Sequence, residues 1–245
     1  MNQNRALHGR GSTPPAIAAL AAGLMGLALA GCAVPAESPV ALSDPGRTPI
    51  DQALIGTWYS ADEAGRQAVV LHIMPRPEAA EIFVVATATL AAEDEAESGA
   101  YWLAATGYPS RVGGETYFNL RRVKGLGLDY TAEGEEPGFV IVRVVPSEAG
   151  TLRLCPLYLG LGHDDAAAKT RPGREVEGRF QQTGDSEPEL EPYVVLDLDR
   201  DKLAAFVAQV PLSDGGLAEI EGDAAFICFP PFHKAAATAK SVWPY

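Results

Sequence analysis

Short runs in which hydrophobic and polar residues alternate follow one another along the chain from residue 54 onward. In residues 68–74, for example, Val69, Leu71 and Ile73 occupy every second position and therefore share one face of an extended strand. Glycine, proline and acidic residues that favour turns separate the runs. The pattern predicts strands over residues 54–59, 68–74, 81–90, 101–108, 116–123, 138–145, 151–157, 191–198 and 224–229.

The segment 199–210 has the periodicity of a helix instead. Four apolar side chains share one helical face at positions i, i+3, i+4 and i+7, namely Leu203, Phe206, Val207 and Val210. Asp199 or Asp201 stands where a carboxylate can accept hydrogen bonds from the first-turn amides. The whole pattern predicts a mostly β protein, an antiparallel barrel or sandwich of about 7–9 strands with one C-terminal amphipathic helix.

Two segments lack either pattern. Residues 32–52 contain four prolines and little periodicity, so we expect a flexible tether there. Residues 161–189 are polar and long for an ordinary loop, so we expect an insertion or a mobile flap. The predicted β domain then extends over residues 53–233, and residues 234–245 form a tail.

The chain begins with a short polar stretch that carries Arg5 and Arg10 and no acidic residue. An apolar run over residues 16–30 follows, and it is short for a membrane span, which needs about 20 apolar residues. The run ends in Leu-Ala-Gly directly before Cys32. A basic start, a short apolar run and small residues at a cleavage site are typical of a secretory signal.

The Leu-Ala-Gly-Cys ending resembles the lipobox of bacterial lipoproteins. This resemblance implies that residues 1–31 are a signal peptide, that the Cys32 thiol is diacylated, as with palmitate, and that cleavage before Cys32 allows N-acylation. In Gram-negative lipoproteins an aspartate after the cysteine favours inner-membrane retention. Since Ala33 stands there, we expect the outer membrane, with the domain facing the periplasm. The alternative is an ordinary secretory signal or a weak membrane anchor with a fortuitous cysteine.

Removal of the export segment makes the protein more acidic. The chain carries 19 basic and 32 acidic residues, and two basic but no acidic residues precede Cys32. The mature chain therefore has 17 basic against 32 acidic residues, a net charge of −15. This charge argues against nucleic acid and anionic lipid surfaces as partners, because both are bound through basic patches. We expect contact with the bilayer through acylated Cys32, and no cofactor.

Three cysteines are present in the chain. With Cys32 assigned to lipid, Cys155 and Cys228 form an even pair in an oxidising compartment, where disulfides persist. A disulfide between them would contribute roughly 4 kcal/mol on the loop-entropy model. The alternative is two buried free thiols that act as small hydrophobic side chains.

The tripeptide Gly56-Thr57-Trp58 opens the first predicted strand and resembles the Gly-x-Trp motif of lipocalins and lipocalin-like bacterial lipoproteins. The resemblance implies a lipocalin-like barrel in which Trp58 plugs one end and Gly56 permits close backbone approach. Lipocalins also lay an arginine from the last strand across this tryptophan. Residues 193–198 offer no arginine, which leaves Arg153 as the candidate. A plain core tryptophan is the alternative.

The chain lacks the residue sets of common metal and catalytic sites. His72, His163 and His233 are far apart, and none has a second histidine at the spacing of a zinc-binding helix. An Asp-x-Asp-x-Asp run begins like a calcium loop, but Lys202 and Ala208 stand where glycine and glutamate are required. No Gly-x-Ser-x-Gly elbow is present. We therefore expect no metal site and no catalytic residue.

Two functions remain open on these grounds. The first is a membrane-anchored envelope lipoprotein that binds a small apolar or amphipathic ligand in its barrel. The alternative is a structural or protein-interaction lipoprotein with a filled, non-binding barrel, which would contact another envelope protein through residues 161–189 and its tail. A hydrolase ranks last, because it would need His72 or His163 beside a serine or cysteine in a cleft.

Overall fold

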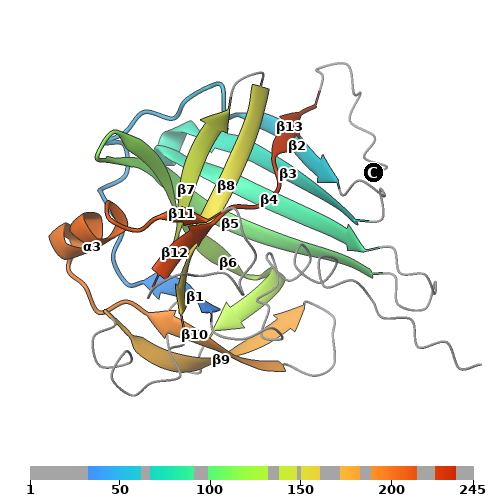
Figure 1. The fold of residues 1–245 in the computed structure, drawn as a ribbon. Helices are drawn as coiled ribbons and strands as arrows, with labels where there is room; N and C mark the ends of the chain where they lie inside the picture. Colours follow the sequence, from blue (N-terminus) through green and yellow to red (C-terminus); the bar gives the residue numbers. More distant parts are fainter. Residues whose placement is uncertain are drawn as a thin grey trace, which may run out of the picture.

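The computed structural model describes residues 33–61, 67–90, 99–131, 138–147, 150–160, 172–182, 189–213 and 224–235. These residues are mostly in strands, with one α-helix among them (Figure 1). The strands are β1 (Ala33–Ser38), β2 (Gly56–Ala61), β3 (Gln67–Arg76), β4 (Glu81–Leu90), β5 (Gly99–Val112), β6 (Glu115–Thr131), β7 (Phe139–Ser147), β8 (Thr151–Gly160), β9 (Arg174–Gln182), β10 (Glu189–Val195), β11 (Leu212–Ser213), β12 (Ala224–Ile227) and β13 (Phe232–Lys234). The helix is α3 (Arg200–Val207), and a 3₁₀ turn, η1 (Pro77–Ala79), joins β3 to β4.

The strands from β2 to β8 form a meander that closes into a barrel. Each pairs antiparallel with the next, β8 then pairs with β13, and β13 returns to β2. The prediction of a mostly β protein with an antiparallel barrel is therefore confirmed. β2, β4 and β8 run toward the same end, and β1 begins there with Ala33 opposite Gly160. We name this the Ala33 end, and the opposite end, where β2 begins and η1 lies, the Trp58 end.

Strands β6 to β8 are buried on both faces because they separate two hydrophobic cores. Phe118 on β6 belongs to the core inside the barrel, whereas its neighbour Tyr117 belongs to a core outside the barrel wall, beneath α3, β10 and β12. β8 is accordingly an almost continuous buried run rather than an alternating one. The barrel core contains Leu54, Trp58, Val69, Leu71, Ile73, Ile82, Val84, Ala86, Ala88, Phe118, Val142, Val144, Leu152, Leu154 and Phe232.

The flexible tether predicted over residues 32–52 is wrong for the described residues of that range. Ala33–Ser38 form β1, which pairs with β7, β8 and β10 inside the sheet. Ala36 and Ser38 are fully buried, and Leu42 packs in the outer core. The sequence did not predict this strand, since its prolines and weak periodicity give no strand pattern. Its pairing partners also all lie more than a hundred residues away along the chain.

A buried asparagine holds the segment after β1 against the barrel wall. Asn119 on β6 is fully buried, and its Oδ1 accepts a hydrogen bond of 2.8 Å from the Leu42 amide. Its Nδ2 donates to the carbonyl oxygen of Tyr108 at 3.0 Å and to Ser110 Oγ at 2.7 Å. Ser110 Oγ also lies 2.6 Å from Ser43 Oγ. Both polar atoms of Asn119 are thus satisfied, as burial requires.

The interpretation of residues 161–189 as an insertion or flap also needs correction. Arg174–Gln182 within this range form β9, which pairs antiparallel with β10 and with the end of β6. β10 pairs in parallel with β1, so the hairpin extends the sheet, and Figure 1 shows β1, β9 and β10 together below the barrel strands. Residues 161–171 and 183–188 lie outside the described residues.

The predicted helix is present but shorter than residues 199–210. Its N-cap is Asp199, whose side chain accepts a 2.9 Å hydrogen bond from the Lys202 amide. Leu203 and Val207 are fully buried in the outer core. The helix ends at Val207, since a residue that precedes a proline disfavours the helical conformation and Val210 precedes Pro211. No helix among the described residues is long and apolar enough to span a membrane.

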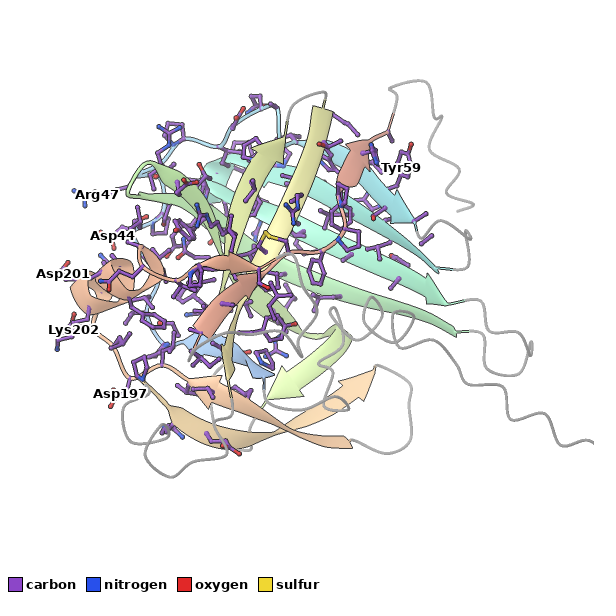
Figure 2. All side chains as sticks on the ribbon, viewed as in Figure 1. Asp44, Arg47, Tyr59, Asp197, Asp201 and Lys202 are labelled. Carbon is purple, nitrogen blue, oxygen red and sulfur yellow. A yellow bond between two sulfur atoms is a disulfide. The ribbon has the colours of Figure 1, made fainter. Side chains whose placement is uncertain are left out.

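A disulfide joins Cys155 on β8 to Cys228, which directly follows β12 (Figure 2). The two sulfur atoms are 2.12 Å apart, and the two residues are separated by 73 positions in the sequence. Cys155 is fully buried in the outer core, and Cys228 packs against that core. The bridge therefore fastens the C-terminal strands to the barrel wall.

Candidate functional site

The Trp58 end of the barrel is closed by the indole and by a lysine of the last strand. Trp58 is buried, and its Nε1 donates a 2.9 Å hydrogen bond to the Leu54 carbonyl oxygen. Lys234 Nζ lies over the indole, 5.2 Å from the ring centroid, and donates to the Ala53 carbonyl oxygen at 2.8 Å. Gly56 has a φ of 136°, and a Cβ there would lie 3.2 Å from Lys234 Cε. A cation over an indole face is attractive, so the lysine stabilises this closure.

Sequence reasoning missed Lys234 because it assigned residues 234–245 to a tail. Lys234 pairs with Trp58 in the ladder between β13 and β2, which places the cation beside the indole. Arg153, the sequence candidate, lies between Leu152 and Leu154, which both face the barrel interior. Because side chains alternate along a strand, Arg153 is on the outer face and away from Trp58.

On β2 and β4 the inward-facing side chains become smaller from the Trp58 end toward the Ala33 end, whereas on β5 Leu103 faces inward opposite Ala86. Along β2, buried Trp58 is followed on the same face by buried Ser60. Along β4 the series of buried inward residues is Ile82, Val84, Ala86 and Ala88. In a small barrel the interior is normally filled by side chains, so a run of alanine and serine lowers the side-chain volume in this half. Val69 and Leu71 of β3 lie opposite the two alanines and add apolar lining to this half.

A buried ion pair faces the same half of the interior. Arg122 lies opposite Ala105 in the β5–β6 ladder, and Glu37 lies opposite Val140 in the β1–β7 ladder. Paired residues share a face of the sheet, and Val140 packs on the barrel core. The Arg122 guanidinium donates to Glu37 Oε1, and the Gly138 amide donates to Glu37 Oε2 at 3.1 Å. Their side chains are only 13% and 6% exposed, so a charged pair is buried in the barrel wall.

The remaining candidate residues from the sequence do not gather into a site. Cys32 and His163 lie outside the described residues. His72 Nδ1 lies 2.9 Å from the Thr57 hydroxyl. His233 packs against the ring of Tyr59, and Tyr59 is exposed on the outer surface (Figure 2). Within the described ranges, no group of three His, Cys, Asp or Glu side chains is placed to hold a metal ion.

Two phenols of the barrel wall have shifted ionisation. Burial raises the pKa of the Tyr108 phenol and of the Tyr117 phenol, and nearby arginines oppose the shift only in part. Both side chains therefore stay neutral at physiological pH. Tyr117 packs against Phe226 in the outer core, so it takes no part in the barrel interior.

No protein-family model, curated protein or solved structure matches the chain.

Proposed function

We propose that this protein is a membrane-anchored lipoprotein of the cell envelope whose barrel binds a small amphipathic ligand. Acylated Cys32 is the anchor, and the outer membrane, with the domain facing the periplasm, is the proposed location. The lipobox-like ending of residues 16–32 supports the anchor. The binding role rests on the interior of the barrel at the Ala33 end.

One observation supports ligand binding more than any other: small apolar side chains and a buried ion pair line the same half of the interior. Ligand sites are mostly apolar and carry a few placed polar groups that fix orientation. Ala86 and Ala88 provide apolar lining with the smallest hydrophobic side chains. Arg122 and Glu37 provide donors and acceptors for a polar head group. An amphipathic molecule with a short apolar chain matches both features.

The first test asks which molecule, if any, is bound inside the barrel. Protein extracted from membranes in mild detergent is washed and analysed by mass spectrometry for non-covalently bound lipids. We expect a stoichiometric amphipathic molecule and displacement of a fluorescent fatty-acid probe. Absence of a bound molecule, together with absence of probe binding, would contradict the binding role and favour the alternative of a filled, structural or protein-interaction barrel.

A pair of variants on β4 sharpens this test. Ala88→Phe adds a ring inside the barrel, whereas Thr87→Phe adds the same ring on the outer face of the same strand. We expect Ala88→Phe to abolish probe binding with little loss of stability, and Thr87→Phe to bind as the wild type does. If the interior is already full, Ala88→Phe instead destabilises the fold by about 1–3 kcal/mol through overpacking.

A further inference from the structure

The barrel starts directly after the proposed lipid anchor. β1 begins at Ala33, the residue that follows Cys32. Neighbouring Cα atoms are about 3.8 Å apart, so the acylated residue is separated from the sheet by a single peptide bond. β1 cannot act as a spacer, because Ala36 and Ser38 are fully buried and the strand is paired on both edges.

The direction of β1 fixes which end of the barrel lies next to the anchor. β1 is antiparallel to β8, and Ala33 is opposite Gly160, the last residue of β8. β2 and β4 run in the same direction as β8, so their last residues, Ala61 and Leu90, lie at the same end of the barrel as Gly160. β3, a strand of 10 residues and therefore about 30 Å long, runs from this end to the Trp58 end, where η1 lies.

We infer that acylated Cys32 holds the Ala33 end of the barrel directly against the bilayer and keeps the Trp58 end away from it. This orientation rests on the proposed lipid anchor. With no spacer, the domain cannot turn over while its acyl chains stay inserted. The half of the interior lined by Ala86, Ala88 and the Arg122–Glu37 pair then faces the head groups.

The orientation also narrows the class of ligand. A ligand that enters through the end facing the membrane comes from the bilayer without crossing water. The ligand class is therefore a membrane lipid or a free fatty acid, with its acyl chain along the apolar lining of β3 and β4 and its head group at the Arg122–Glu37 pair. The closed Trp58 end, with Lys234 over the indole, faces the aqueous compartment.

Two labelling positions on one wall test the orientation. Ala61 and Glu78 are both exposed, and β3 spans the distance between them, from the Ala33 end to the Trp58 end. In Ala61→Cys and Glu78→Cys each new thiol is the only free one, because Cys155 and Cys228 are bridged and Cys32 carries lipid. Each variant of the acylated protein is labelled with a fluorophore in phosphatidylethanolamine–phosphatidylglycerol vesicles that contain a lipid with a nitroxide head group.

We expect several-fold stronger quenching at the Ala61 position than at the Glu78 position. A flexible glycine–serine linker inserted between Cys32 and Ala33 should remove most of that difference while the protein stays on the vesicles. Equal quenching in the acylated protein without the linker would overturn the orientation and leave the anchor intact. Metabolic labelling with palmitate, lost in Cys32→Ser, checks the anchor separately, and no label on the wild type would overturn both proposals.

Discussion

Replacement of Asn119 by alanine tests whether the segment after β1 is a fixed part of the fold. Asn119 Oδ1 is the acceptor for the buried Leu42 amide, 77 residues earlier in the chain. Asn119→Ala leaves that amide without its partner, and the Tyr108 carbonyl oxygen and Ser110 Oγ each lose a donor. A flexible tether would not respond to this change, since it would have no contact with β6.

The cost follows from the three hydrogen bonds. A buried donor without a partner costs about 1–3 kcal/mol, and each of the other two bonds contributes about 1 kcal/mol net. Asn119→Ala should therefore lower the free energy of unfolding by about 3–5 kcal/mol, a large share of the 5–15 kcal/mol of an average domain. Ser43→Ala is the matched control, because it removes the part-buried contact with Ser110 and an exposed hydrogen bond to the Asp44 carbonyl oxygen, and it should cost about 1 kcal/mol or less.

Urea unfolding of the mature chain with Cys32→Ser measures both changes. Hydrogen exchange at the Leu42 amide gives a local reading, and we expect strong protection in the wild type and its loss in Asn119→Ala. A free energy of unfolding that changes by less than about 0.5 kcal/mol would refute the reasoning, since surface substitutions change stability by that little. So would an unprotected Leu42 amide in the wild type.

Three further predictions concern other parts of the molecule. Reduction of the Cys155–Cys228 disulfide, which closes a loop of 73 residues, should lower the unfolding free energy by roughly 4 kcal/mol, measured by urea titration with and without reductant. Lys234→Ala should lower the melting temperature and increase solvent quenching of the Trp58 emission, whereas Lys234→Arg should keep both near their wild-type values. Equal values in the two variants would argue against a role for the cation. The hydrogen bonds to Lys202 lower the pKa of Asp199 below its ordinary 3.8, so the stabilisation by this cap is complete above pH 3.8 and is lost as the pH falls toward the folded pKa. Asp199→Asn should remove that part of the acid dependence, which thermal melts between neutral and acidic pH will measure.

The candidate site was only partly visible in the sequence. Gly56 and Trp58 were recognised because they are neighbours in the chain and open a strand. Glu37 and Arg122 were not recognised, since an isolated glutamate and an isolated arginine are ordinary surface residues until the strands that carry them meet. The series from Ile82 to Ala88 is present in the sequence, but only closure of the barrel shows that it lines an interior.

The sequence by itself determined the succession of strands from β2 to β8, β10 and β12, the late helix and its aspartate cap. These features depend on side-chain alternation and on contacts between residues a few positions apart, so a short stretch of sequence is enough to predict each of them. The tertiary structure alone decided that β1 is a buried strand, that β9 extends the sheet, and that Lys234 closes the barrel over Trp58. Each of these depends on pairing between distant segments, such as the 85 positions that separate Glu37 from Arg122, and residues that far apart carry no periodic signal of their meeting. The same long-range pairing places Ala33 at one end of the barrel, and the orientation proposed for an anchor at Cys32 rests on that placement.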